Sequence, residues 1–231
     1  MRHVIAVSTS VLLLSAIVGA ADLSSSETKR LEEASSVVRE LRAEPDKGIP
    51  DGLWSRAECV AVIPNLKKAA FMVGGEFGKG VLSCHSGAGW SAPVFVEIEK
   101  GSMGFQIGGE QVDLVLLVMN KGGIEKMLQD KVNLGGDAAV AAGPVGRMAS
   151  ASTDAQLHAG ILAYSRTQGA YAGIDISGGV LRPDKSANQN AYGTTMTPRD
   201  VLAKADVVAP PPARAFVQTL QQETRATTGR R

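Results

Sequence analysis

Aromatic side chains are scarce in this 231-residue chain, where Phe, Trp and Tyr make up 4% of the residues against 26 glycines. Few aromatics and many glycines fit strands joined by tight turns better than a helical bundle. The length suits about one domain, or one large β domain, with a proper hydrophobic core.

Neither sign of charge is in excess, since 24 Lys and Arg residues face 23 Asp and Glu. Without Arg2, which belongs to the leader described below, the count becomes 23 against 23. Binding to a nucleic acid requires a basic surplus or a strong basic patch. The composition therefore argues against nucleic acid as the main partner.

Residues that carry catalysis are also few. Outside the leader the only histidines are His85 and His158, too far apart in sequence to suggest a metal pair. No serine lies in a Gly-x-Ser-x-Gly elbow, and the aspartates are scattered. The sequence thus predicts a protein that is not an enzyme and has no metal or cofactor. A hydrolase without a recognisable motif is kept as a third functional alternative, after the two hypotheses given at the end of this section.

The two cysteines, Cys59 and Cys84, lack the paired spacing of a zinc site. In an oxidising compartment such an even pair favours one disulfide over two buried thiols. However, if 59–63, 69–73 and 79–84 form a simple three-stranded meander, the two cysteines fall at its opposite ends. Both alternatives stay open at this point.

The first 20 residues have the form of a cleavable secretory signal. Arg2 precedes an apolar run from Val4 to Ala20, and Val18 and Ala20 satisfy the small-residue rule for cleavage. We expect cleavage after Ala20, or alternatively after Ala21. A membrane anchor is disfavoured, because the run is only about 17 residues where a bilayer needs ~20. The protein is therefore expected to be exported, periplasmic or secreted, and possibly peripheral on a membrane.

Residues 21–48 contain an amphipathic helix over Ser24–Ala43. Its apolar stripe comprises Leu31, Ala34, Val37, Val38 and Leu41. Ser24 and Glu27 form a capping box, and Pro45 and Gly48 end the helix. Docking of the stripe onto the protein is favoured over a membrane-surface helix, because the polar face carries both signs of charge.

Residues 49–193 are predicted to be β-rich, and 194–231 a helical extension and tail. Ile49–Glu58 forms a short helical turn, and Pro64-Asn65 is expected to be a turn. Expected strands are Cys59–Ile63, Ala69–Gly75, Gly78–Cys84, Ala92–Glu99, Gly101–Gly108, Val112–Met119, Asp137–Ala142, Gly160–Thr167 and Gly169–Leu181. Further helices are expected over Gly122–Asp130, from Thr197 onward, and around Phe216. The predicted fold class is α+β, with a curved, largely antiparallel sheet or barrel-like core and helices near both termini.

The densest glycine cluster spans 74–80. It is not a Walker loop, because no Ser or Thr follows Lys79. It is not a dinucleotide-binding fingerprint either, because that motif requires a helix after the glycines and none follows this cluster. We interpret it as a strand-turn-strand segment whose glycines permit a bulge or a close backbone approach.

Several ordered blocks between Ile49 and Gly193 resemble the SYLF domain family. The blocks are Ala61-Val62-Ile63-Pro64-Asn65 with Lys67-Lys68, Gly74–Val81, Trp90-Ser91-Ala92-Pro93, Gly104–Gly109, Asp113–Asn120, Ala141–Arg147, Tyr164-Ser165-Arg166, Gly173 and Asn188–Gly193. The resemblance implies binding to membrane lipids, an actin-binding role in fungal members, and no catalysis. The leader on a stand-alone domain resembles the bacterial, exported branch.

The leading hypothesis is accordingly a non-catalytic module that binds anionic phospholipid head groups or a membrane surface. The candidate lipid-binding cations are Lys67, Lys68, Lys79, Arg147 and Arg166, each beside a turn or a strand end. The second hypothesis is an envelope protein–protein interaction or scaffold module whose partner is unknown.

Overall fold

The computed structural model describes residues 23–43, 48–71, 73–86, 89–103, 108–120, 131–145, 159–167 and 170–228. Four sequence predictions fall outside these ranges: the signal over 1–20, the helix over Gly122–Asp130, His158 and the cation Arg147.

The described elements follow one another as a helical start, a series of strands and a helical end. The helices are α1 (Ser25–Ala43), α2 (Asp51–Trp54), α5 (Lys185–Tyr192), α6 (Pro198–Ala203) and α7 (Pro211–Thr228). The strands are β1 (Cys59–Phe71), β2 (Val73–Ser86), β3 (Gly89–Trp90), β4 (Val94–Met103), β5 (Gly108–Val118), β6 (Val132–Asn133), β7 (Val140–Ala142), β8 (Ile161–Thr167), β9 (Ala170–Gly173) and β10 (Val180–Pro183).

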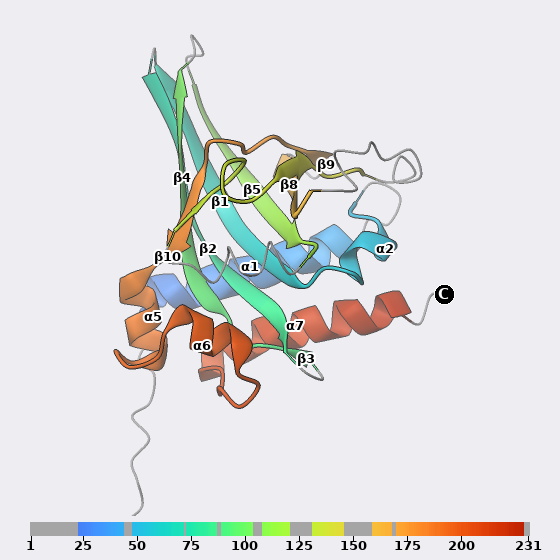
Figure 1. Ribbon diagram of the computed structural model, residues 1–231, viewed down its shortest axis with the longest axis vertical. Coiled ribbons are helices and arrows are strands. Elements are labelled where there is room, and N and C mark those ends of the chain that lie inside the picture. Colours follow the sequence, from blue (N-terminus) through green and yellow to red (C-terminus); the bar gives the residue numbers. More distant parts are fainter. Residues whose placement is uncertain are drawn as a thin grey trace, which may run out of the picture.

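The described strands form one curled sheet with the order β6-β10-β4-β2-β1-β5-β8-β7, while β3 pairs with β2 and β9 with β8. The pairings along this path are antiparallel except that of β7 with β8. Helices from both ends of the chain lie together against the lower half of the sheet (Figure 1). The predicted fold class, a curved and largely antiparallel sheet with helices near both termini, is confirmed.

Each face of the sheet has its own hydrophobic core, and successive residues of a strand point alternately into one and the other. Val60 and Val62 of β1 face the helices and pack with α1 and α7 residues such as Leu31 and Phe216. Cys59, Ala61 and Ile63 point the other way, into a second cluster that fills the inside of the curl. We call these two sides the helix face and the inner face.

Helix α1 has the start and the packing that its sequence predicts. The Ser24 amide donates to Glu27 Oε2 at 2.6 Å and the Glu27 amide donates to Ser24 Oγ at 3.3 Å, which completes the capping box. All five residues of the predicted stripe are no more than 3% exposed. The stripe is therefore docked on the sheet and on α7, as the favoured interpretation expected.

Two further helices, α6 and α5, lie near the C-terminal end of the sheet-forming region. Thr197 and Asp200 form a capping box at the start of α6, with Pro198 in its first turn. The segment Pro183–Tyr192, whose polar sequence predicts a turn with at most one helical turn, contains the longer, eight-residue helix α5 capped by Asp184. Asp184 accepts from the Ala187 amide, a role that favours helix initiation.

The segments 59–63, 69–73 and 79–84 do not form a simple three-stranded meander. Strands β1 and β2 form one long hairpin, so that Cys59 lies directly opposite Cys84 and the two are joined by a disulfide. Pro64-Asn65 is not a turn between strands but an irregularity within β1, where the pairing register shifts and Asn65 adopts a φ of 53°. Asn is among the residues that tolerate this left-handed conformation best.

The glycine cluster lies within the continuous strand β2 rather than in a strand-turn-strand segment. The expected close approach of two backbones is found at Gly80. A Cβ there would lie 2.1 Å from the Val62 carbonyl oxygen and 2.8 Å from the Ile63 Cα. At Gly78 a Cβ would lie 2.5 Å from Ile63 Cγ2. These glycines thus make room for the irregular part of β1.

The predicted strand boundaries differ elsewhere as well. Of the strand expected over Gly101–Gly108, the first three residues belong to β4, which continues to Met103, and Gly108 begins β5, while 104–107 lie outside the described residues. The segment Gly169–Leu181 contains the two strands β9 and β10 with a turn at Ser177-Gly178 between them. Runs of apolar residues and glycines mark strands but do not fix where one strand ends.

Candidate functional site

One end of the sheet extends beyond the helices. It is formed by β4, β2, β1 and β5 side by side and projects at the upper left of Figure 1. We call this part, from the paired row of Glu99, Phe77, Lys67 and Gln111 to the far ends of the four strands, the sheet end. Three of the sequence blocks that resemble the SYLF domain contribute to it, so its residues are candidates for function.

Lys67 and Phe77 are cross-strand partners at the base of the sheet end. Both side chains are exposed, and that of Phe77 is 41% exposed. Lys67 alternates with Leu66 of the inner core, so it points to the helix face. An exposed cation and an exposed ring therefore lie next to each other on one face.

Lys68 lies on the opposite face. Cross-strand pairing places it in a row of four charged residues, in the order Lys100, Glu76, Lys68 and Glu110. Lys68 Nζ lies 3.9 Å from Glu110 Oε2. The signs alternate along this row, so its net charge is zero.

Lys79 contacts carboxylates at the other end of the helix face. Its Nζ lies 2.8 Å from Asp184 Oδ2 and 3.6 Å from Glu97 Oε2. Arg30 of α1 donates to the same Asp184 oxygen at 3.1 Å. Burial acts to raise the pKa of Asp184, but the hydrogen bonds from Lys79, Ser186 and Arg30 outweigh it and lower the pKa to about 2.

Arg166 is likewise held by carboxylates. Its Nε donates to Asp113 Oδ2 at 2.9 Å, and its guanidinium also pairs with Glu40 of α1. Asp113 accepts a further hydrogen bond from the Asn65 amide at 3.0 Å. Burial raises the pKa of Asp113, which the Asn65 amide opposes and the charge of Glu33 reinforces.

These groups line a surface cleft of about 260 Å³ between α1 and the irregular part of β1. Its walls are Glu32, Glu33, Ser36, Val37, Glu40, Pro64, Asn65, Asp113 and Arg166. Four carboxylates face one guanidinium, so the cleft favours a cationic group over a phosphate when the acids are ionised. Sequence reasoning placed Arg166 on a phosphate-binding surface, and it did not anticipate this acidic surrounding.

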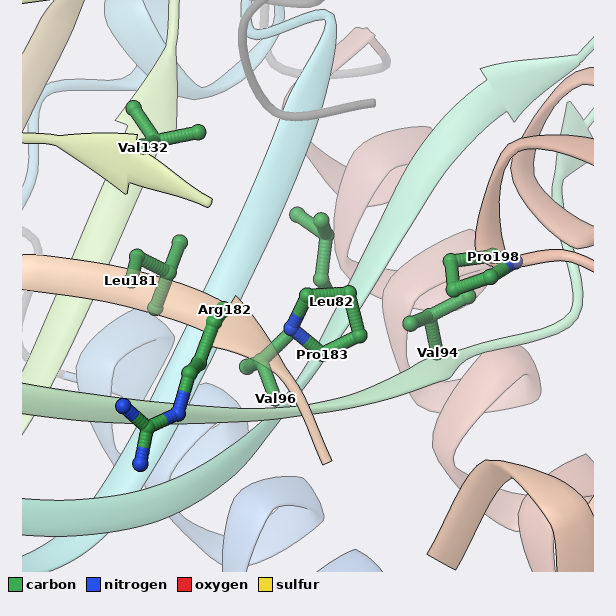
Figure 2. A pocket seen from close by; sticks show the side chains of 8 residues that line it. All are labelled: Leu82, Val94, Val96, Val132, Leu181, Arg182, Pro183 and Pro198. Carbon is green, nitrogen blue, oxygen red and sulfur yellow. The ribbon is translucent and has the colours of Figure 1, made fainter. Parts of the chain in front are cut away.

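A second, much smaller apolar pocket holds about 10 Å³ on the inner side of β4 and β10. Figure 2 shows Leu82, Val96 and Leu181 around it, with the Arg182 guanidinium directed away. Arg182 instead pairs with Glu97 and Glu99. A volume of this size holds at most about one water molecule, so no organic ligand fits here.

The described residues contain no group of three or more His, Cys, Asp or Glu that could hold a metal ion. None of the helices in these same ranges is long and apolar enough to span a bilayer.

The structure brings three of the predicted cations, Lys67, Lys79 and Arg166, to the helix face and places Lys68 on the inner face. Sequence reasoning missed Phe77 and the carboxylates that hold the cations. Phe77 carried a signal, because a lone aromatic within a glycine-rich strand has no bulky neighbours to bury it. Asp184 carried none, because its partners lie 105 and 154 residues away in the sequence.

The family model described as "Ysc84: Las17-binding protein actin regulator" matches residues 99–223, more than half of the chain. The chain belongs to the Ysc84 family. The resemblance to the SYLF domain is thereby confirmed. The matched part of this Ysc84-family chain includes Asp113, Arg166, Asp184 and the β5 side of the sheet end.

Curated relatives agree with this assignment. LAS seventeen-binding protein 3 of Saccharomyces cerevisiae is 32% identical over 172 residues, which cover 73% of this chain and 37% of that protein. SH3 domain-containing YSC84-like protein 1 of Rattus norvegicus is 30% identical over 200 residues, covering 84% of this chain and 58% of the relative. This Ysc84-family chain therefore spans little more than a third of the yeast protein and just over half of the rat protein.

The names of these relatives describe Las17 binding, actin regulation and SH3 domains, and none names an enzyme. The sequence-based expectation that the chain is not an enzyme agrees with these names.

Proposed function

We propose that this chain is an exported, non-catalytic module that binds anionic phospholipid head groups at a membrane surface. The observation that supports it most is the exposed pair of Lys67 and Phe77 at the sheet end. Aromatic and aliphatic side chains suit the boundary between head groups and acyl chains, and a nearby ammonium is attracted to anionic lipids.

The other predicted cations contribute less directly. Lys68, Lys79 and Arg166 are each within 4 Å of a carboxylate, so a lipid phosphate has to compete with a protein partner for them. Lys67 is exposed, and no ion pair is recorded for it among the described residues. A charge of this kind near an anionic membrane contributes about 1 kcal/mol. Lys67 therefore makes the largest electrostatic contribution to the proposed membrane binding.

Helix α1 is not proposed as the membrane-binding element. Its apolar stripe is buried between the sheet and α7, and Arg30, Glu40 and Arg42 tie it to other elements through ion pairs. Exposing the stripe would remove it from the hydrophobic core at a cost of about 1.5–3 kcal/mol per large side chain.

A matched pair of charge reversals tests the proposal. Lys67→Glu should weaken binding to vesicles of phosphatidylcholine and phosphatidylglycerol by about tenfold or more, because it replaces an attractive charge with a repulsive one. Lys185→Glu makes the same change at an exposed site on α5, away from the sheet end, and should leave binding nearly unchanged. Equal binding by wild type and both variants would contradict the assignment of Lys67.

Export is the second part of the proposal and rests on the leader sequence. The intact mass of the exported product should correspond to a chain that begins at Ala21 or Asp22. A product that retains Met1 would refute cleavage of the signal.

An envelope protein–protein interaction is the second candidate function. It is favoured by the family description as Las17-binding protein and by the acidic cleft beside α1, which suits a basic segment. An exported protein does not meet cytosolic actin in its own cell, so the partner would be a different protein. A photo-crosslink from Ser36 in the cleft to an envelope protein, with no binding to either kind of vesicle, would favour this candidate.

A further inference from the structure

The charges along the four strands of the sheet end stop at a sharp boundary. The row of Lys100, Glu76, Lys68 and Glu110 is the last one that contains charged residues. Beyond it the paired residues are Gly101, Gly75, Ala69 and Gly109, then Ser102, Gly74, Ala70 and Gly108, and finally Met103, Val73 and Phe71. Three successive rows thus carry no charge, and the last is apolar.

We propose that this uncharged part of the sheet end enters the interface of an anionic phospholipid bilayer, with the charged row at the level of the head groups. The inference rests on the membrane binding proposed above and adds the element that penetrates. Among the described residues, the row of Phe71, Val73 and Met103 lies farthest beyond the charged row, and Phe77 with Lys67 lies at the base of the sheet end.

The length of the uncharged part agrees with shallow penetration. Three residues of antiparallel strand span about 10 Å. Apolar faces of interfacial elements enter about 5–10 Å into the boundary between head groups and acyl chains. No described helix covers this part of the sheet (Figure 1).

Backbone hydrogen bonding limits how deeply the sheet end can enter the bilayer. Strand β10 pairs with β4 only as far as Glu99, and β8 pairs with β5 only from Asp113 onward. Among the described residues no strand covers the outer edges of 101–103 and 108–111. Their amides and carbonyls need water or head groups as partners, because unpaired backbone groups are costly in hydrocarbon. The sheet end therefore stays at the interface and does not cross the bilayer.

The binding test compares serine substitutions in the last row of the sheet end with a serine substitution elsewhere on the surface. Val73→Ser changes a residue of the last row, whereas Val208→Ser removes an apolar side chain that is 73% exposed in the segment between α6 and α7. Combined with Phe71→Ser, Val73→Ser should lower partitioning into vesicles of phosphatidylcholine and phosphatidylglycerol by at least about tenfold. Val208→Ser should bind as wild type. Thermal melting confirms that each variant is folded.

Fluorescence quenching measures penetration independently. Phe71→Trp places a tryptophan in the last row, while the native Trp54 and Trp90 are only 0% and 6% exposed and supply a constant background. Lipids brominated near the head-group end of the acyl chains should quench this variant more strongly than lipids brominated near the chain terminus. Val208→Trp should show no quenching.

The outcomes separate this inference from the function on which it rests. Vesicle binding that is retained in the double serine variant, without quenching of Phe71→Trp, would overturn penetration and leave surface binding through Lys67 intact. An equal loss in Val208→Ser would also overturn it, because any exposed apolar side chain would then suffice. Absence of vesicle binding by the unmodified mature protein would refute both.

Discussion

Arg30 of α1 and Asp184, the residue that caps α5, form a buried ion pair with Nη1 and Oδ2 3.1 Å apart. The two residues are 154 positions apart in the sequence, and Lys79 of β2 joins them at the same oxygen. This contact fixes α1 to the sheet and to α5. It therefore helps to keep the apolar stripe of α1 in the core and leaves the sheet end as the exposed element.

Removal of the shared carboxylate should destabilise the protein strongly. Asp184→Ala leaves the Arg30 guanidinium buried without its anion and also removes the cap of α5. Breaking a buried pair in this way costs about 3–5 kcal/mol. Lys79→Met, at a side chain that is 39% exposed, should cost about 1 kcal/mol or less. Urea unfolding of both variants measures the difference, and equal costs would contradict a central role of Asp184.

The lowered pKa of Asp184 predicts a loss of stability in acid. Since its pKa is about 2 in the folded state against an ordinary value of 3.8, the unfolded chain binds more protons between these values. The stabilisation is complete above the unfolded pKa and disappears as the pH falls from about 4 towards about 2. Urea midpoints over this range should fall more steeply for wild type than for Asp184→Asn. Parallel curves would show that another group controls acid unfolding.

The disulfide between Cys59 and Cys84 should be complete in the folded protein. Thiol titration of the denatured, unreduced protein should find no free thiol. Replacement of both cysteines by alanine should cost about 3 kcal/mol, because the bond closes a segment with a sequence separation of 25 residues. Two reactive thiols in the titration would refute the bond and leave the cysteines as small core residues.

Glycine is required at Gly80 but not at Gly75 of the same strand. A Cβ at Gly80 would lie 2.1 Å from the Val62 carbonyl oxygen, whereas one at Gly75 has its nearest contact at 3.6 Å. Gly80→Ala should therefore destabilise by about 3 kcal/mol or prevent folding, and Gly75→Ala should change stability by less than about 1 kcal/mol. Equal thermal melting of the two variants would contradict the close approach of β1 and β2.

Local signals in the sequence were sufficient for the elements at the two ends of the domain. Ser24 with Glu27 and Thr197 with Asp200 each set a helix start, because a capping box depends only on residues three apart. The buried stripe of α1 followed from helical periodicity, and the curved antiparallel sheet from the short spacing of apolar runs. These features need no knowledge of distant contacts.

The features that sequence reasoning missed depend on contacts between distant segments. Pro64-Asn65 has the composition of a turn, but pairing with β2 and β5 on both sides keeps it inside a strand. The cations of the proposed lipid surface were identified by their position beside strand ends. Their partners Asp113, Asp184 and Glu40 come from other elements, so neither the pairing nor the face could be predicted.

Co-sedimentation of the mature protein with vesicles tests the central claim most directly. The account predicts binding to phosphatidylcholine vesicles that contain phosphatidylglycerol and weaker binding to phosphatidylcholine alone. Raising the salt should weaken the preference for the anionic vesicles, because the charge of exposed Lys67 is screened. No binding to either kind of vesicle at low salt, by protein that melts as a folded domain, would contradict the account.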